Sequence, residues 1–426
     1  MTDTPRLPVG SGLHYAHGTL HLEQVSLAEL VKRFGSPLFV YSKQVMLDAL
    51  HAYTQGLSPH PHRVHYAMKA NSSLAVLQVF ANAGCGFDIV SGGELARAMQ
   101  AGARAQDCVF SGVGKTTAEI DQALAAGIGC FNVESLSELQ HISSRAQALG
   151  KVAPISLRVN PDVDAGTHPY ISTGLRDNKF GISHADAVAA YRYACELGGL
   201  HITGIDCHIG SQITQATPFF DAMERVFDLV DALTQQGITL QHIDLGGGLG
   251  IDYQGEQPPS ATHLWQTTVQ RLHARGLQRH ALWCEPGRSL VGNAGVCLSQ
   301  VVVCKPTAHK NFLILDAAMN DLPRPAMYQA YHEIVPVTPR GEPPLLWDVV
   351  GPVCETGDWL GRARTLAAHE GDVLAICSAG AYGMSMASQY NARPRAAEVL
   401  VHGDTVHLIR ERERHETLWQ GEHLVT

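Results

Sequence analysis

Long apolar segments are missing from this chain of 426 residues. No stretch approaches the roughly 20 consecutive apolar residues that a membrane-spanning helix needs. Met1 to Gly12 is polar and lacks the apolar core of a signal peptide. We therefore expect a cytoplasmic protein without a membrane partner. The net charge of −9 at pH 7 argues against a nucleic-acid partner, because nucleic-acid-binding surfaces are basic.

Paired cysteines and metal-binding motifs are also missing. The ten cysteines include no C-x-x-C pair, and many lie in strand-like segments. We expect most of them to be buried thiols in a reducing compartment. The 23 histidines show no H-E-x-x-H spacing, so we expect no metal site.

Lysine is scarce, with eight lysines against 23 arginines. One of them, Lys69, lies in the stretch from His65 to Asn71, at the end of an apolar run that has the alternation of a strand. A lysine buried there would have a lowered pKa and an accessible neutral amine, the form that makes an imine with an aldehyde cofactor. On this stretch alone, an edge-strand lysine that reaches water remains the alternative.

Short apolar runs alternate with amphipathic segments through the first two thirds of the chain. This alternation is typical of parallel strands joined by helices, and so many units in about 250 residues favour a closed (β/α)₈ barrel of the TIM type. We place this barrel domain at residues 37–284. The expected strands are 37–41, 64–70, 86–90, 108–111, 130–133, 155–159, 204–208, 242–246 and 281–285.

The pattern changes after Glu285 to short strands separated by Gly, Pro and Asp. We therefore expect an all-β domain, a β-sandwich or Greek-key β-barrel, formed by residues 1–36 and 285–426. The N-terminal segment His14 to Leu22 alternates like a strand and is expected to join it. The other expected strands are 292–303, 311–316, 345–349, 372–378, 397–401 and 405–408.

Several polar side chains stand at or near the carboxyl ends of the expected barrel strands, where the active sites of such barrels lie. They are Lys69, Asp88, His208, Glu285 and Arg288. Each has an ordinary structural explanation by itself: Asp88 could cap a helix, His208 could be a hydrogen-bonded core residue, and Glu285 could face solvent in a turn. Five such groups at one end of one barrel favour a reactive site.

The run from Asp244 to Gly250 is rich in glycine and follows an expected strand. It fails as a dinucleotide motif, because Ile251 stands where the last glycine is needed, but it suits a phosphate cradle. A tight turn is the alternative, and Gly210-Ser211 and Gly287-Arg288 nearby favour phosphate. A phosphate anchor, a lysine and a carboxylate together suggest pyridoxal phosphate, whose ring nitrogen Glu285 would keep protonated.

These residues and further motifs resemble the fold-type III pyridoxal-phosphate decarboxylases, in particular those that act on meso-2,6-diaminopimelate. The resemblance covers about residues 14–410, with one mild departure at Ala317-Ala318, where Ala-Gly is commoner. The further matching segments are 160–164, 167–174, 178–181, 316–325, 351–358 and 380–388. A series in this fixed order is more specific than any single motif.

The resemblance implies roles for individual residues. Lys69 would form the imine with the cofactor, Glu285 would pair with the ring nitrogen, and His208 would stack on the ring. Cys354 would be the proton donor and, with these three, makes up the catalytic set. The cofactor-binding residues would be Lys69, Asp88, His208, Ser211, Gly247, Gly248, Glu285, Gly287, Arg288 and Tyr382.

The substrate-binding residues implied by the resemblance are Arg288, Arg324, Tyr328, Glu355 and Tyr382. The two arginines imply an anionic far end of a small amino-acid substrate, because the guanidinium fork matches a carboxylate. In the family, the residues that match Cys354 and Glu355 enter the active site of the neighbouring subunit. We therefore expect a homodimer with shared active sites, to which the β domain contributes substrate-binding and dimer-interface residues.

Three alternatives remain. The first is a related decarboxylase that acts on a D-amino acid, arginine or carboxynorspermidine. The second is an amino-acid racemase on the same barrel, although Glu285 argues against it, since a racemase typically places an arginine at the ring nitrogen. The third is a non-catalytic regulator, which would be expected to have lost Lys69 or Cys354.

Overall fold

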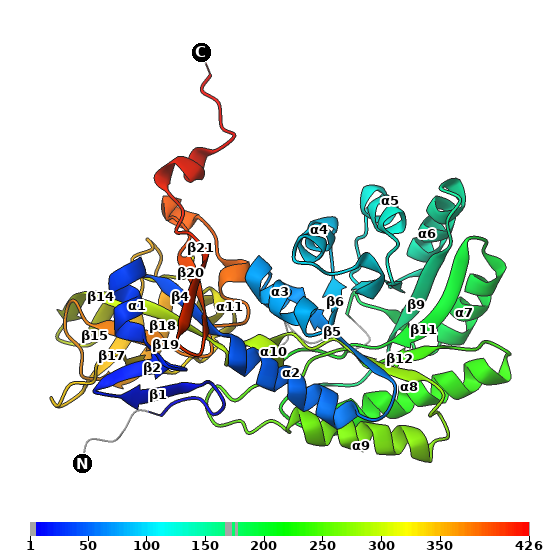
Figure 1. The fold of residues 1–426 in the computed structure, drawn as a ribbon, viewed down its shortest axis with the longest axis horizontal. Helices are drawn as coiled ribbons and strands as arrows, with labels where there is room; N and C mark the ends of the chain where they lie inside the picture. Colours follow the sequence, from blue (N-terminus) through cyan, green and yellow to red (C-terminus); the bar gives the residue numbers. More distant parts are fainter. Residues whose placement is uncertain (1–5, 167–172, 175–177, 426) are drawn as a thin grey trace. The chain divides into compact units, whose positions relative to one another are not determined.

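The computed structural model describes residues 6–166, 173–174 and 178–425, and the chain in it divides into two compact units (Figure 1). The barrel unit comprises Leu47–Ile251 and Gln257–Leu290. The β unit comprises Met1–Met46, Asp252–Glu256 and Val291–Thr426. Among the described residues, no helix has the length and apolar character that crossing a membrane requires.

The barrel unit is built on a closed parallel sheet, which confirms the predicted TIM-type barrel. The ring runs in the order β9, β11, β12, β13, β5, β6, β7, β8, and the pairing of β8 with β9 closes it. A two-residue strand, β10 (Ile182–Ser183), is attached to β9 outside the ring. The ring strands are β5 (His62–Ala67), β6 (Gly86–Ile89), β7 (Cys108–Phe110), β8 (Cys130–Val133), β9 (Ala153–Asn160), β11 (Leu200–Asp206), β12 (His242–Asp244) and β13 (Ala281–Cys284).

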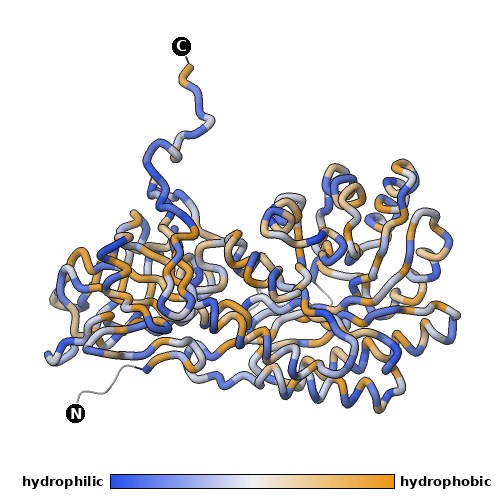
Figure 2. Tube along the Cα trace, viewed as in Figure 1, coloured by the Kyte–Doolittle hydropathy of each residue, from blue (hydrophilic) through white to orange (hydrophobic). Residues whose placement is uncertain are grey.

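Helices cover the outside of this ring (Figure 1). Their starts follow from the sequence: Ser91 and Ser135 accept hydrogen bonds from backbone N–H groups of the first helical turn, and Thr116 forms a capping box with Glu119. Hydrophobic and hydrophilic residues alternate along them (Figure 2). The helices are α2 (Lys43–Leu57), α3 (Leu74–Asn82), α4 (Gly92–Gln100), α5 (Thr117–Ala126), α6 (Leu136–Ala148), α7 (Ala187–Glu196), α8 (Thr217–Gln235), α9 (Ala261–Ala274) and α10 (Arg288–Val291).

The prediction that residues 37–41 form the first barrel strand was wrong. Strand β4 (Leu38–Ser42) belongs to the β unit, where it pairs antiparallel with β14 (Gly295–Pro306) and parallel with β20 (Ala397–His402). Every residue of β4 is buried, as in a barrel strand, so its apolar run could not distinguish the two sheets. The other eight expected runs are the eight strands of the ring, and residue 37 therefore lies too early for the start of the barrel.

The β unit contains a nine-stranded sheet and a separate three-stranded one, which confirms a second, sheet-based domain. Three of its strands, β3, β16 and β18, were not expected from the sequence. The remaining strands are β1 (Leu13–Ala16), β2 (Thr19–Leu22), β3 (Val25–Ser26), β15 (Asn311–Leu315), β16 (Ile334–Pro336), β17 (Leu345–Val350), β18 (Trp359–Leu366), β19 (Val373–Ile376) and β21 (Thr405–Arg410).

The two sheets of the β unit share a hydrophobic core. Leu20 and Leu22 of the N-terminal hairpin pack with Val40, Val296 and other side chains of the large sheet, and all are buried. Removing a leucine from such a core costs about 2–5 kcal/mol. The N-terminal segment therefore joins the β unit, as predicted. Short helices complete the chain: α1 (Leu27–Phe34), α11 (Arg324–Tyr328), η1 (Met68–Ala70), η2 (Ala105–Asp107), η4 (Met384–Met386), η5 (Tyr390–Ala392) and η6 (His415–Trp419).

Candidate active site

Lys69 lies just beyond the carboxyl end of the first ring strand. Strand β5 ends at Ala67, and Lys69 is in the 3₁₀ turn η1 rather than in the strand itself. Its side chain is 37% exposed, so the expectation of a buried lysine was wrong. The Nζ atom lies 2.5 Å from Oδ2 of Asp88 on the neighbouring strand β6. The amine is therefore paired with a buried carboxylate while the side chain stays partly exposed.

Asp88 is buried, and its role differs from that of a helix cap. The following helix α4 is capped by Ser91, whose hydroxyl accepts from the backbone N–H of Glu94. The carboxylate of Asp88 pairs with Lys69 instead. Its other oxygen, Oδ1, is buried and has no hydrogen-bond partner among the residues described. A buried acid in this state is typical of a functional site, because burial without a partner costs free energy.

His208 presents an uncharged, fixed imidazole at the same end of the ring. Strand β11 ends at Asp206, and Nδ1 of His208 accepts a hydrogen bond of 3.1 Å from the backbone N–H of Gly247. Desolvation by the surrounding protein, together with the positive charges of Arg158 and Lys69, holds the pKa of His208 well below its usual value. A neutral, flat ring held in one orientation suits stacking on another aromatic ring.

The glycine run after β12 packs tightly against two other loops. A Cβ atom at Gly247 would lie 2.1 Å from the carbonyl oxygen of Glu285, and one at Gly248 would lie 2.5 Å from that of Gly210. Gly248 also has a φ of +103°, which disfavours any larger residue. The run therefore requires glycine for close backbone approach, which is also what an anion cradle of backbone N–H groups requires.

Ser211 and Arg288 bring polar groups to these loops. An Nη atom of Arg288 donates a hydrogen bond of 3.0 Å to the Ser211 hydroxyl, and both the arginine and Glu285 are buried. A cationic guanidinium, a hydroxyl and glycine backbone around one point form a donor set suited to a phosphate or a carboxylate. The structure thus brings together the expected Ser211, Gly247, Gly248 and Arg288.

Glu285 follows the end of β13, and only 5% of its surface is exposed. Desolvation raises the pKa of Glu285 well above its usual value, and the nearby carboxylates of Asp88, Asp244 and Asp206 raise it further. The Nδ2 atom of Asn132 donates a hydrogen bond of 3.0 Å to Oε1 of Glu285.

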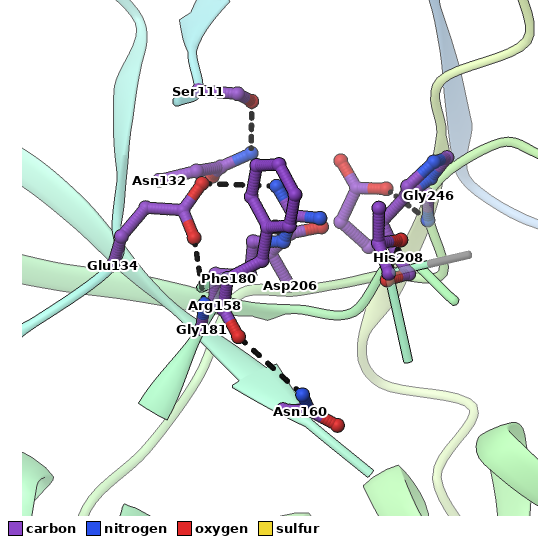
Figure 3. Close-up of polar contacts among 12 residues, drawn as sticks. Ser111, Asn132, Glu134, Arg158, Asn160, Phe180, Gly181, Asp206, His208 and Gly246 are labelled. Atoms are coloured by element: carbon purple, nitrogen blue, oxygen red, sulfur yellow. Dashed lines mark hydrogen bonds and ion pairs between the residues drawn. The ribbon is translucent and has the colours of Figure 1, made fainter. Parts of the chain in front are cut away.

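A group of buried acids surrounds Glu285. Carboxylate oxygens of Asp206, Asp244 and Glu285 all lie within 4.8 Å of one another. Arg158 is the nearby cation, with its Nη1 2.9 Å from Glu134 and its Nε 3.9 Å from Asp206 (Figure 3). Because one arginine is shared between Glu134 and this group, the three acids hold more negative charge than the cation can balance, and protons are retained there.

The residues of this end of the barrel fit pyridoxal phosphate. Lys69 supplies an amine, the loops of Gly248 and Ser211 supply donors for a phosphate, and Glu285 supplies an acidic group for a ring nitrogen. The buried Oδ1 of Asp88 has no partner from the described chain and is available to a polar ligand. When bound, this cofactor would be held by the expected barrel residues.

The expected Gly287 is in the barrel unit, where a Cβ atom would lie 3.1 Å from the carbonyl oxygen of Ala67. The remaining expected residues belong to the β unit. Arg324 is buried at the start of α11, where its guanidinium stacks over the ring of Tyr253 at 4.6 Å and contacts Nε2 of His332 at 2.8 Å. The same short helix ends with the half-buried Tyr328. Tyr382 is half-buried with a φ of +56°, a conformation uncommon for a bulky residue. These stacking and hydrogen-bond partners fix Arg324 more firmly than a surface arginine.

Cys354 and Glu355 are exposed on one loop of the β unit. The buried Asp358 anchors the loop, because its carboxylate accepts hydrogen bonds of 2.7 Å from the backbone N–H groups of Met319 and Val353. The Tyr390 hydroxyl donates a hydrogen bond to Glu355. The loop is therefore held by hydrogen bonds to Asp358, while Cys354 and Glu355 stay accessible.

Sequence reasoning missed several of these residues. Asp206 and Asp244 each end a ring strand, so an acid at the end of an apolar run could have been found. Asn132 and Arg158 lie inside strands and gave no comparable signal. The expected segment 167–174 falls mostly outside the described residues and is not located.

Comparison with known proteins gives a consistent result. Residues 44–292 match the family described as pyridoxal-dependent decarboxylase, pyridoxal binding domain. The diaminopimelate decarboxylase of Neisseria meningitidis is 56% identical over 93% of this chain and 97% of its own length. That of Pseudomonas aeruginosa is 53% identical over 96% and 98%. A crystal structure of the M. jannaschii diaminopimelate decarboxylase in co-complex with L-lysine superimposes with a TM-score of 0.93 at 38% identity, covering 99% of both chains.

Proposed function

This chain belongs to the pyridoxal-dependent decarboxylase family, and from this premise we propose that it converts meso-2,6-diaminopimelate into L-lysine and carbon dioxide. The observation that carries the proposal is the convergence of the Lys69–Asp88 ion pair, the neutral His208 and the acidic Glu285 at one end of a closed barrel. The high identity to relatives named diaminopimelate decarboxylase supports this substrate over other amino acids.

Pyridoxal phosphate, when bound, supplies an electron sink for the pair of electrons left when the Cα–carboxylate bond breaks and carbon dioxide leaves. Lys69 would provide the amine that holds the aldehyde carbon, and Asp88 orients that amine. His208 would support one face of the ring. Gly248, Gly287 and Ser211 would bind the phosphate, and Glu285 would hold the proton on the ring nitrogen.

We assign the remaining steps to residues of the β unit. Cys354 donates a proton to Cα by general acid catalysis after carbon dioxide has left. Arg324 and Tyr328, with Arg288 of the barrel unit, bind the far carboxylate of the substrate. Glu355 binds the far ammonium, and Tyr382 contacts both cofactor and substrate. The fixed guanidinium of Arg324 supports this assignment, because a planar fork recognises a carboxylate in one orientation.

A homodimer with shared active sites is part of this proposal. Cys354 and Glu355 are exposed on a loop with a buried anchor, as residues that serve a neighbouring subunit would be. We also propose that the enzyme works in the cytoplasm, where its ten unpaired cysteines would remain reduced.

The proposed function can be tested by incubating the cofactor-loaded protein with meso-2,6-diaminopimelate and measuring carbon dioxide and L-lysine together. Parallel reactions contain D-lysine, L-arginine or carboxynorspermidine at the same concentration. We expect equal amounts of carbon dioxide and L-lysine from diaminopimelate alone. Release of carbon dioxide only from another substrate would contradict the roles of Arg324 and Glu355, and no release from any substrate would contradict the function.

A further inference from the structure

Asn132 lies beside Glu285 in the interior of the ring and has no part in the chemistry assigned above. Its side chain is almost completely buried on strand β8, and its Nδ2 atom donates to Oε1 of Glu285 at 3.0 Å. The same atom donates to the hydroxyl of Ser111 at 3.1 Å (Figure 3). Within the part of the chain that the structure describes, Asn132 is the one hydrogen-bond donor to this carboxyl group. We propose that Asn132 is a positioning residue, which aims Glu285 at the ring nitrogen of the cofactor and favours the ionised form of Glu285 once a protonated ring nitrogen lies beside it. This inference rests on the proposed function.

The charges around Glu285 show why such a donor is needed. Three acids on other strands of the ring act on it: Asp88 on β6, Asp206 on β11 and Asp244 on β12. Oδ1 of Asp206 and Oδ2 of Asp244 are buried and accept no hydrogen bond from any residue between 6 and 425 that the structure describes. These acids favour the protonated form of Glu285, as does its burial. Two cations oppose them, Arg158 on β9 and Lys69 after β5.

Glu285 must be in its ionised form to fulfil its assigned role once the ring nitrogen is protonated. A carboxylic acid donates a hydrogen bond, whereas a protonated ring nitrogen requires an acceptor. An amide N–H that donates to a carboxyl oxygen favours the ionised form of that group. Asn132 occupies Oε1 in this way, and Oε2 is then the oxygen left for the ring nitrogen.

Asn132 is itself fixed by a separate set of contacts. Its backbone carbonyl accepts a hydrogen bond of 2.8 Å from Nζ of Lys115, which also pairs with Glu138 at 2.7 Å. Ser111, which directly follows the adjacent strand β7, holds the amide of Asn132. The donor is therefore held in place before any cofactor binds, as a preorganised electrostatic contact requires.

The test measures affinity rather than turnover. Apoprotein is titrated with pyridoxal phosphate and with its 1-deaza analogue, in which a C–H group replaces the ring nitrogen. The dissociation constant of the analogue, divided by that of pyridoxal phosphate, is compared between variants. In Asn132→Leu we expect this ratio to fall by about tenfold, because the contact to a charged group is lost. Asn132→Asp, which keeps the shape but replaces the donor with a fourth acid, should lower the ratio at least as much.

Ser111→Ala is the matched control, since it removes the other hydrogen bond of the same amide and leaves the one to Glu285. Because Lys115 still holds the backbone of Asn132, the ratio of this control should fall by much less than that of Asn132→Leu. An unchanged ratio in both folded Asn132 variants would overturn the inference and leave the proposed function intact. If the wild type bound neither compound, the proposed function would fail and this inference with it.

Discussion

The Nζ atom of Lys69 lies 2.5 Å from Oδ2 of Asp88, and the two partners differ sharply in exposure: the lysine side chain is 37% exposed and the aspartate side chain is inaccessible. Asp88 therefore acts as a fixed point in the wall of the barrel, while Lys69 extends from that wall toward the open end. Such an arrangement holds an amine in one place without removing it from solvent. It is more suitable for a reactive lysine than the complete burial expected from the strand pattern.

Replacing Lys69 with alanine should abolish the visible absorbance that the cofactor gains on attachment. Turnover should fall by more than about 10³-fold, because the chain loses the group that positions the reacting carbon. Absorbance and released carbon dioxide measure the two effects. Lys32→Ala is the control, since Lys32 is exposed on α1 and pairs only with Glu29. Substantial turnover by Lys69→Ala would refute the assignment.

Cys354→Ala should leave cofactor binding unchanged and slow the formation of L-lysine by about 10²-fold or more, as expected for the loss of a general acid. The rate of L-lysine formation is the measurement. Cys195 is the matched control, because it is also exposed but lies on helix α7 of the barrel unit. A wild-type rate in Cys354→Ala would require another proton donor.

Arg324→Lys should raise the KM for diaminopimelate by about tenfold or more while the protein stays folded. Lysine keeps the positive charge but loses both the planar fork and the stacking on Tyr253. Steady-state kinetics give the result. Arg33→Lys serves as the comparison, because Arg33 stacks on Phe34 in the same unit but has no assigned role. Equal KM values for both variants would contradict substrate binding by Arg324.

The interior of the barrel should make stability depend on pH. His242 stacks on Trp283 with ring centroids 3.5 Å apart, and desolvation lowers the pKa of His242 from 6.5 to about 3. The unfolded chain therefore binds a proton at His242 below pH 6.5 that the folded chain does not bind. Its contribution to stability is complete above pH 6.5 and is lost progressively as the pH falls toward 3. At pH 5 the loss is about 2 kcal/mol.

The variant His242→Gln should lack this effect. On going from pH 7 to pH 5, the change in its free energy of unfolding should be about 2 kcal/mol less destabilising than the change in the wild type. Urea unfolding at the two pH values measures it. Buried acids with raised pKa values, such as Glu285, act in the opposite direction but do so in both proteins. His402→Gln, at an exposed position, should behave like the wild type.

Much of the architecture followed from the sequence because parallel barrel strands are buried on both faces and appear as short apolar runs. Eight of the nine expected runs form the ring. The remaining run, expected at 37–41 and observed as β4 (Leu38–Ser42), is also buried, and only its pairing with β14 and β20 identifies its sheet. Strand pairing between segments hundreds of residues apart leaves no local mark in a sequence.

The candidate site was predictable where a charged or glycine residue interrupts an apolar run, as at Lys69 and Gly247. Asn132 was missed because a single neutral amide within a strand has the same appearance whether it orients a catalytic group or only packs. Asp244 was overlooked because the glycines after it explained the run without it. The charge balance around Glu285 depends on several strands at once, which no single segment reveals.

The placement of β4 between β14 and β20 has a consequence for synthesis on the ribosome. Residues 62 to 284 contain all eight strands of the ring, so the barrel can close while the last third of the chain is still untranslated. Strand β4, made before the barrel, must wait for Ala397–His402 before both its edges are paired. During that interval a mainly apolar strand lacks a partner on at least one edge, which exposes the nascent chain to aggregation and to chaperones.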